Sequence, residues 1–293
     1  MSCDKTVSIV IPAKNEGRAL GELLSRLRDL KIIAEVIVVD DGSSDDTAQL
    51  AEAAGATVIR HPYSMGNGAA IKSGARRASG EIIVFMDGDG QHQPEDIPRL
   101  LAKMEEGYEM VVGARTTVSS QAGLHRAAAN GFYNRFASWM VGQPILDLTS
   151  GFRAVRASKF RRFLFLLPNG FSYPTTITMS FFRTGLPVAY LPIDVKKRIG
   201  RSHVRLLRDG VRFLLIIFKI GTLFSPMKLF LPVSLSFFGT GVAYYIYTYL
   251  TQHRFTNMSA LLLITSVLVF LIGLVSEQIA ALNFKGTDDG DEL

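Results

Sequence analysis

The chain has one cysteine, Cys3, among its 293 residues, so it can form no internal disulfide, and a reducing compartment suits it. Charge is also scarce, because 20% of the residues are charged whereas 48% are hydrophobic. This composition excludes a disordered chain, which needs low hydrophobicity and high net charge. The amino terminus lacks an apolar run of signal-peptide length, so we expect it to remain in the cytoplasm.

The net charge of +6 comes from one segment rather than from the whole chain. Between Asp194 and Lys228 stand nine basic residues and only two acidic ones, which leaves the rest of the chain close to neutral. A charge confined in this way argues against a nucleic-acid-binding protein. Basic residues recur there at helical spacing between leucines and phenylalanines: Arg205, Arg208, Arg212 and Lys219. This pattern predicts an amphipathic helix on an anionic membrane surface.

Two apolar runs follow the basic segment. Leu229–Leu250 has no charged residue, and Met258–Leu282 has only Glu277. Each is long enough for the roughly 20 residues that cross a bilayer, so we predict two transmembrane helices, with a buried helical hairpin as the alternative. The basic residues before the first run predict that residues 1–228 and the acidic tail, 285–293, face the cytoplasm. We also expect the two helices to support a homo-oligomer.

Five short runs rich in β-branched residues occupy the first part of the chain. Stretches with helical periodicity separate them, and the first of these has an apolar stripe of Leu20, Leu23, Leu24 and Leu27. The runs are Val7–Ile11, Val36–Val39, Thr57–Ile59, Ile82–Met86 and Met110–Val112. Continuous apolar runs of this length are typical of parallel strands covered on both faces. The alternation therefore predicts an α/β domain with a mostly parallel sheet and helices on both faces.

Ligands of such sheets bind beyond the carboxyl ends of the strands, and three of these ends are acidic: Pro12–Gly17, Asp40–Asp45 and Met86–Asp96. Carboxylates that converge on one edge repel each other unless a cation joins them. Asp87-Gly88-Asp89, with Gln91, offers hard oxygen ligands at two-residue spacing. This pattern predicts a Mg²⁺ or Mn²⁺ site that shares the ion with phosphate oxygens.

Two other interpretations of these loops fail on the sequence. A calcium-binding EF-hand needs glycine and glutamate where His92 and Pro98 stand. A dinucleotide-binding fingerprint needs a third glycine where Ile71 follows Gly66 and Gly68.

Six motifs occur in one order along the chain: IPAKNE, VVDDGSSD, GNGAAIKSG, MDGDGQHQP, GAR and DLTSGFRA. Together they resemble the inverting family 2 glycosyltransferases of the GT-A fold, and more narrowly the polyprenyl-phosphate enzymes similar to dolichol-phosphate mannose synthase. The resemblance covers residues 6–205 and the carboxyl-terminal helix pair. It implies a catalytic domain over 1–195, a basic juxtamembrane segment over 196–228, a transmembrane hairpin over 229–284 and a short tail.

The resemblance also implies roles for residues at the strand ends. The nucleotide-sugar contacts it implies are Pro12, Lys14, Glu16, Val39, Asp41, Asp87, Gly88 and Arg198. Lys14 stands where an aromatic residue is common in the family. Asp89 and Gln91 match metal ligands, and Arg115 and Arg126 match residues near the acceptor phosphate. Asp87 and Asp147 are the catalytic candidates; Asp147 could act as a base or orient a sugar hydroxyl, or could cap the following turn.

Two further features have less specific interpretations. His92 follows the proposed metal ligands, and we expect it to form a hydrogen bond rather than to bind the ion, because carboxylate and amide oxygens suit Mg²⁺ better. Aromatic residues recur on one helical stretch, at Phe132, Tyr133, Phe136 and Trp139, and we expect them to contact the core or a membrane rather than a sugar.

The expected function is that of a membrane-anchored inverting glycosyltransferase. It would move one sugar from GDP-mannose or a UDP-sugar to undecaprenyl or dolichyl phosphate at the cytoplasmic face of the cell membrane. One alternative is a processive polysaccharide synthase, which carries a Gln-x-x-Arg-Trp motif; the only tryptophan, Trp139, follows Ala137-Ser138 instead. Another is a non-catalytic nucleotide-sugar-binding scaffold subunit, which would gain nothing from clustered carboxylates.

Overall fold

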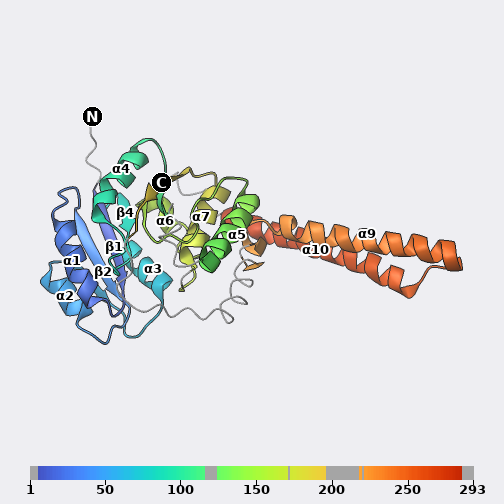
Figure 1. Cartoon of the computed structure of the whole chain (residues 1–293), viewed down its shortest axis with the longest axis horizontal. Helices are drawn as coiled ribbons and strands as arrows, with labels where there is room; N and C mark the ends of the chain where they lie inside the picture. The colour runs from blue at the N-terminus through green and yellow to red at the C-terminus, as the bar shows by residue number, and fades with distance from the viewer. Residues whose placement is uncertain (1–5, 116–123, 171, 196–217, 220, 286–293) are drawn as a thin grey trace. The chain divides into compact units, whose positions relative to one another are not determined.

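The computed structural model describes residues 6–115, 124–170, 172–195, 218–219 and 221–285 (Figure 1). The chain divides into two compact units, Met1–Val204 and Arg205–Leu293, which are considered separately below. Arg198, Arg205, Arg208 and Arg212 lie outside the described residues, as do the acidic tail and the side chain of Arg126. The amphipathic helix expected around the three arginines of the second unit therefore stays a prediction.

The first unit is built on a seven-stranded sheet with the order β3-β2-β1-β4-β6-β5-β7. Its strands are β1 (Val7–Ala13), β2 (Glu35–Asp40), β3 (Thr57–Arg60), β4 (Ile82–Phe85), β5 (Met110–Arg115), β6 (Arg153–Arg156) and β7 (Val188–Ile193). All neighbours run parallel except β6, which is antiparallel to both β4 and β5. The mostly parallel α/β fold predicted from the sequence is confirmed, with each of the five predicted strands in place.

Strands β6 and β7 were not predicted. The four residues of β6 begin and end with arginine, so the sequence shows no apolar run there. In β7, Pro192 interrupts the run of apolar residues, and the strand lies at the edge of the sheet, where proline is tolerated.

Helices cover both faces of the sheet, as the two periodicities of strand and helix require (Figure 1). They are α1 (Gly17–Arg28), α2 (Thr47–Ala53), α3 (Asn67–Arg77), α4 (Ile97–Glu105, preceded by the 3-10 turn η1, Pro94–Asp96), α5 (Leu124–Val141), α6 (Ala157–Arg161) and α7 (Tyr173–Arg183). Helix α1 buries the predicted leucine stripe, Leu20, Leu23, Leu24 and Leu27, in the same apolar cluster as Ile9 and Ile11 of β1.

Helix α3 packs on the opposite face of β1 through a glycine. A side chain at Gly74 would overlap Cγ1 of Val10, which alternates with Ile9 and Ile11 along the strand. The middle and the carboxyl-terminal part of α3 are also held by the segment before α7. Lys72 Nζ donates to the carbonyl of Leu167 at 3.1 Å, and Arg161 Nε donates to the carbonyl of Ala75 at 2.9 Å.

The second unit contains α9 (Pro226–Gln252) and α10 (Asn257–Lys285), which match the two predicted apolar helices. Both are long and apolar enough to cross a membrane, and only 11% and 17% of their most apolar windows are buried within the chain. The alternative of a buried soluble hairpin requires helices that are mostly buried, so the low burial argues against it.

Polar and small residues join the two helices. The Ser234 hydroxyl donates to the Ser266 carbonyl at 2.9 Å, and the Ser266 hydroxyl returns a bond to the Ser234 carbonyl at 3.0 Å. A Cβ atom at Gly241 would lie 3.1 Å from Leu262, whereas one at Gly239 would meet nothing within 4 Å. Gly241 therefore serves the α9–α10 contact; the homo-oligomer stays a prediction.

The glycine contact of α3 gives a test of packing. We expect Gly74→Ala to lower stability by about 1–3 kcal/mol, because the methyl group overlaps Val10 in a packed core. Gly21→Ala is the matched control: this exposed α1 glycine has nothing near its Cβ position, and alanine there should raise stability by about 0.5–1 kcal/mol. Thermal unfolding of the full chain in detergent measures both, and an unchanged midpoint for Gly74→Ala would contradict the described packing.

Candidate functional site

The strand order brings two distant segments to one edge of the sheet. Strands β1, β2 and β4 are parallel, so their carboxyl ends share that edge. Because β6 runs the other way, its first residue, Arg153, pairs with Phe85, the last residue of β4. The turn that enters β6 therefore meets the loop that leaves β4. Arg153 also pairs with Val112, so Arg115 at the end of β5 reaches the same edge.

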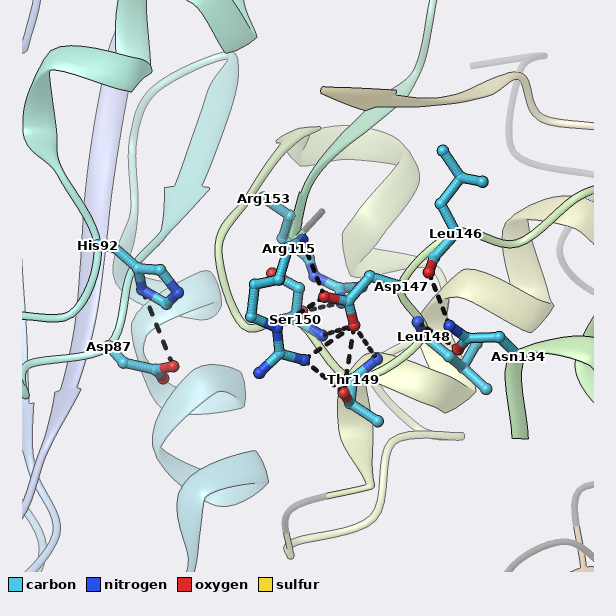
Figure 2. A network of polar contacts seen from close by, with 10 residues as sticks. All are labelled: Asp87, His92, Arg115, Asn134, Leu146, Asp147, Leu148, Thr149, Ser150 and Arg153. Atoms are coloured by element: carbon cyan, nitrogen blue, oxygen red, sulfur yellow. Dashed lines mark hydrogen bonds and ion pairs between the residues drawn. The ribbon is translucent and has the colours of Figure 1, made fainter. Parts of the chain in front are cut away.

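Asp147 holds the side chain of Arg115 in a two-point ion pair. Arg115 Nε donates to Asp147 Oδ2 at 2.7 Å, and Nη2 donates to Oδ1 at 2.9 Å. The backbone amides of Thr149 and Ser150 each donate to Oδ1 at 3.1 Å. Figure 2 shows the carboxylate of Asp147 enclosed by these donors. Both of its oxygens are thus occupied, which favours the capping alternative over a catalytic base.

The electrostatics of the pair agree with this geometry. Burial alone would raise the pKa of Asp147, but the hydrogen bonds and positive charge of Arg115 outweigh it and hold that pKa below its usual value. Burial would lower the pKa of Arg115, and Asp147 in turn raises it. The Asp147 side chain is only 7% exposed, whereas that of Arg115 is 26% exposed, so part of the arginine remains accessible.

Asp87 is more accessible than Asp41, Asp89 and Asp147, with a side chain that is 34% exposed. The backbone of the β6 turn closes on it, since a Cβ atom at Gly151 would lie 2.7 Å from Asp87 Oδ2. On the loop's other side, a Cβ atom at Gly88 would lie 2.8 Å from Glu16 Oε2. Glycine at both positions therefore lets the carboxylates of Asp87 and Glu16 approach the backbone closely.

His92 lies beside Asp87 (Figure 2). Its Nδ1 is 4.0 Å from Asp87 Oδ2, and its ring stacks on Phe152 with centroids 5.0 Å apart. Burial lowers the pKa of His92 to about 4, although the charge of Asp89 opposes the shift. The imidazole is therefore neutral near pH 7, and the 4.0 Å between Nδ1 and Asp87 Oδ2 is too long for a hydrogen bond, so the hydrogen-bonding role expected from the sequence stays a prediction.

Asp89 and Gln91 share one tight turn after β4. The backbone N–H of Gln91 donates to Asp89 Oδ1 at 3.1 Å, and Gly90 supplies the positive φ of 72° that the turn needs. No three His, Cys, Asp or Glu side chains among the described residues lie close enough together to hold a metal alone. Two oxygen donors on a turn nevertheless fit Mg²⁺ or Mn²⁺, which commonly takes one or two protein carboxylates together with substrate phosphates.

Asp41 anchors a neighbouring loop rather than standing open. Its Oδ1 receives bonds of 2.8 Å from His61 Nδ1 and the Met65 amide, and its Oδ2 receives the Ser64 hydroxyl and the Gly66 amide at 2.8 and 2.9 Å. Burial would raise the pKa of Asp41, but these donors, His61 first, lower it. The carboxylate thus fixes the whole 61–66 loop, which the sequence did not indicate.

The remaining nucleotide-sugar candidates lie on β1 and β2. Pro12 and Val39 are paired across the two strands and buried, with Val39 wholly enclosed. Lys14 is exposed at the tip of the next loop, beside Asn15, whose positive φ of 55° is fixed by bonds with Ser43 and Ser44. This conformation gives Lys14 a surface for a ligand and gives Val39 none.

Arg153 supports the site in a way that the sequence did not reveal. Its side chain is fully buried, and Nη1 donates to the Pro174 carbonyl at 3.2 Å and to the Thr178 hydroxyl at 3.1 Å. Nη2 donates to the Ser150 carbonyl. The guanidinium thereby ties α7 to the turn that carries Asp147 and Gly151. Arg153 belongs to the SGFR motif that contributed to the family resemblance, but the motif alone did not indicate a buried, structural arginine.

Comparison with known proteins agrees with this architecture. The model for "Glycosyl transferase family 2" matches residues 8–164, which is more than half of the chain, and the "GtrB C-terminal hairpin" matches residues 225–282. The chain belongs to glycosyl transferase family 2. The resemblance inferred from its motifs is confirmed, and this family 2 glycosyltransferase is an enzyme with polyprenyl-phosphate sugar transferases among its relatives.

Two curated relatives illustrate the similarity. Glycosyltransferase AglJ of Haloferax volcanii is 28% identical over 252 residues, which cover 84% of this chain and 82% of AglJ. The undecaprenyl-phosphate 4-deoxy-4-formamido-L-arabinose transferase of Klebsiella pneumoniae is 37% identical over 162 residues. That match covers 52% of this chain and 49% of the relative, so the chain spans about half the length of the second protein.

A solved structure supports the fold. Glucosyl-3-phosphoglycerate synthase from Mycobacterium tuberculosis, in complex with Mn²⁺, uridine diphosphate and glucosyl-3-phosphoglycerate, is 26% identical with a TM-score of 0.57. The match covers 73% of this glycosyltransferase and 80% of the synthase chain.

The Arg115–Asp147 pair can be tested by a double-mutant cycle. We expect Arg115→Ala and Asp147→Ala each to destabilise the protein, and the double variant to lose about 1–3 kcal/mol less than their sum, because the two residues share one largely buried interaction. The exposed pair of Arg60 and Glu52, at 2.9 Å, is the matched control and should couple by less than about 1 kcal/mol. Thermal or denaturant unfolding measures both cycles, and additive effects of the Arg115 and Asp147 changes would contradict the assignment.

Proposed function

We propose that this family 2 glycosyltransferase transfers a single sugar from a nucleotide diphosphate sugar to a polyprenyl phosphate at the cytoplasmic face of the cell membrane. One observation carries the proposal: the acidic turn Asp87–Gln91 and the cation Arg115 share one edge of the sheet. A site with oxygen ligands for a cation beside an arginine suits a reaction between two phosphate-bearing substrates.

The donor side of the proposal uses the strand ends. Asp89 and Gln91 would hold Mg²⁺ or Mn²⁺ together with diphosphate oxygens, and the ion would supply stabilisation of negative charge on the leaving nucleotide. Asp87, Gly88 and Glu16 would contact the sugar and its phosphates, and the exposed Lys14 would lie beside the nucleoside, whereas the enclosed Val39 and the occupied Asp41 would support this surface from within the fold. Arg198 would reach the diphosphate from outside the described residues. The relative crystallised with Mn²⁺ and uridine diphosphate supports this assignment. GDP-mannose and UDP-sugars are the donors to test.

The acceptor side centres on Arg115. A phosphate monoester has a second pKa of about 6, so a lipid phosphate is largely ionised at neutral pH and needs no strong base to react. The occupied carboxylate of Asp147 is consistent with such an acceptor, because Asp147 then orients Arg115 instead of removing a proton. Arg126 would provide a second phosphate contact. The undecaprenyl-phosphate transferase among the relatives supports undecaprenyl or dolichyl phosphate as the acceptor class.

Two surfaces support a membrane location. Aromatic rings meet near the turn between α9 and α10, where the ring centroid of Tyr245 lies 5.9 Å from that of Tyr249 and 5.4 Å from that of Phe255. Such rings favour the membrane–water interface. Helix α5 exposes Phe132 and Trp139 to 65% and 49%. Residues on its other sides bind the loop before Asp147; for example, the Asn134 amide donates to the Leu146 carbonyl at 2.7 Å. An apolar helix surface thus lies next to the proposed acceptor site. The orientation with both termini in the cytoplasm rests on the basic segment.

A transfer assay tests the function directly. The full chain in detergent is incubated with GDP-mannose or UDP-sugars, Mg²⁺ or Mn²⁺, and undecaprenyl or dolichyl phosphate, and products are identified by mass spectrometry. We expect one lipid-linked monosaccharide and one equivalent of nucleoside diphosphate, dependent on both metal and lipid phosphate. Polymeric sugar would indicate the processive alternative. Nucleotide binding without transfer to any acceptor would indicate the scaffold alternative.

The metal assignment makes a separate prediction. We expect Asp89→Ala to reduce transfer at least about tenfold at saturating Mn²⁺, because the variant loses a hard oxygen ligand. Asp96→Asn is the matched control: Asp96 is equally buried and follows the same loop, but its carboxylate pairs with Arg99 at 2.5 Å. That control should keep the metal dependence of the unaltered chain. Retention of full activity by Asp89→Ala would remove this residue from the metal site.

A further inference from the structure

His92 carries a buried nitrogen that no group satisfies. The residue is 6% exposed, and its Nδ1 has no hydrogen-bond partner among the described residues. A buried polar nitrogen without a partner destabilises the folded state, which indicates that Nδ1 gains a partner in another state of the site. The nitrogen faces the carboxylate of Asp87, whose Oδ2 is 4.0 Å away (Figure 2).

The surrounding residues fix both partners of this gap. The His92 ring lies nearly parallel to Phe152, with 16° between their planes, so the direction of Nδ1 is set by stacking. Gly151, which precedes Phe152, closes on the carboxylate, because a Cβ atom there would lie 2.7 Å from the same Asp87 oxygen. One short stretch of chain, Gly151-Phe152, therefore orients the imidazole and leaves room for the carboxylate.

We propose that His92 is a positioning residue for Asp87, whose Oδ2 accepts a hydrogen bond from His92 Nδ1–H when the nucleotide-sugar and its cation are bound. A movement of about 1 Å converts the separation of 4.0 Å into a hydrogen bond of ordinary length. The bond fixes one oxygen of Asp87 and turns the other toward the ligand. The inference rests on the proposed function, since it concerns the orientation of Asp87 in the site assigned to the donor.

Two amide substitutions separate the roles of the ring nitrogens. The amide nitrogen of His92→Asn can occupy the place of Nδ1, whereas that of His92→Gln reaches the place of Nε2. We expect His92→Asn to keep kcat within about threefold, and His92→Gln to lose about tenfold or more in kcat with a smaller change in the donor KM. His92→Phe, which keeps the stacking and removes both nitrogens, should lose as much as His92→Gln. Equal losses in the Asn, Gln and Phe variants, each with a lowered unfolding temperature, would show a packing role only and overturn the proposal.

A second measurement does not depend on turnover. Nitrogen-15 NMR of the imidazole reports which ring nitrogen carries the proton, first in the free full chain and then with Mg²⁺ and UDP-glucose or GDP-mannose. We expect the proton on Nδ1, with a shift toward a stronger hydrogen bond on ligand addition that Asp87→Ala, which has no side-chain acceptor, abolishes. A proton on Nε2 in the ligand-bound state would overturn the inference. If the unaltered chain forms no lipid-linked sugar yet shows the Nδ1 response, the proposed function fails and the positioning role stands.

Discussion

The insertion of one antiparallel strand is the constraint on which the candidate site depends. Without β6, the loop after β4 and the end of β5 would lie on adjacent parallel strands, with no chain entering from the opposite direction. Because β6 starts at the edge where β4 ends, the turn before it delivers Asp147 to Arg115 and Gly151 to Asp87 in a single pass. The short β6 therefore contributes position rather than core. Arg153 secures that position, since its buried guanidinium joins the turn to α7 through main-chain carbonyls.

Burying an arginine without a carboxylate at ion-pair distance destabilises the folded state. Arg153 is tolerated because its guanidinium lies where it can bond to both the β6 turn and α7. Among the described residues its partners are carbonyls, a hydroxyl and a methionine sulfur, together with the Tyr173 ring at 5.8 Å. These groups do not neutralise the charge of Arg153, but their hydrogen bonds with it keep the turn in place beside α7. Asp147 in turn uses its charge on Arg115. The two arginines thus have different roles. Arg153 fixes the conformation of the turn, and Arg115, which Asp147 of that turn binds, places a positive charge at the edge of the sheet.

The sequence predicted what local pattern determines. Five parallel strands, the leucine stripe of α1, two long apolar helices and the acidic strand ends all follow from periodicity and spacing, and the family from the order of its motifs. It did not predict β6, because four residues bounded by arginines carry no strand signal, and every contact that β6 creates was missed with it. The engagement of Asp41 by the 61–66 loop was missed for a related reason. A carboxylate at a strand end can face a ligand or a neighbouring loop, and sequence spacing alone does not distinguish the two.

The three carboxylates Asp41, Asp87 and Asp147 have different roles, and this difference bears on the chemistry of the proposed acceptor. Asp41 and Asp147 have pKa values lowered by internal donors and are committed to holding protein groups, whereas Asp87 is left accessible. An enzyme that activates a sugar hydroxyl needs a carboxylate that is free to take a proton, and such a group is usually given a raised pKa. A phosphate acceptor arrives already ionised, so a site built for it can use its carboxylates as ligands and supports and rely on arginine to balance the charge. The way Asp147 is bound to Arg115 agrees with the second kind of acceptor, and so do α9 and α10, which are long and apolar enough to cross a membrane.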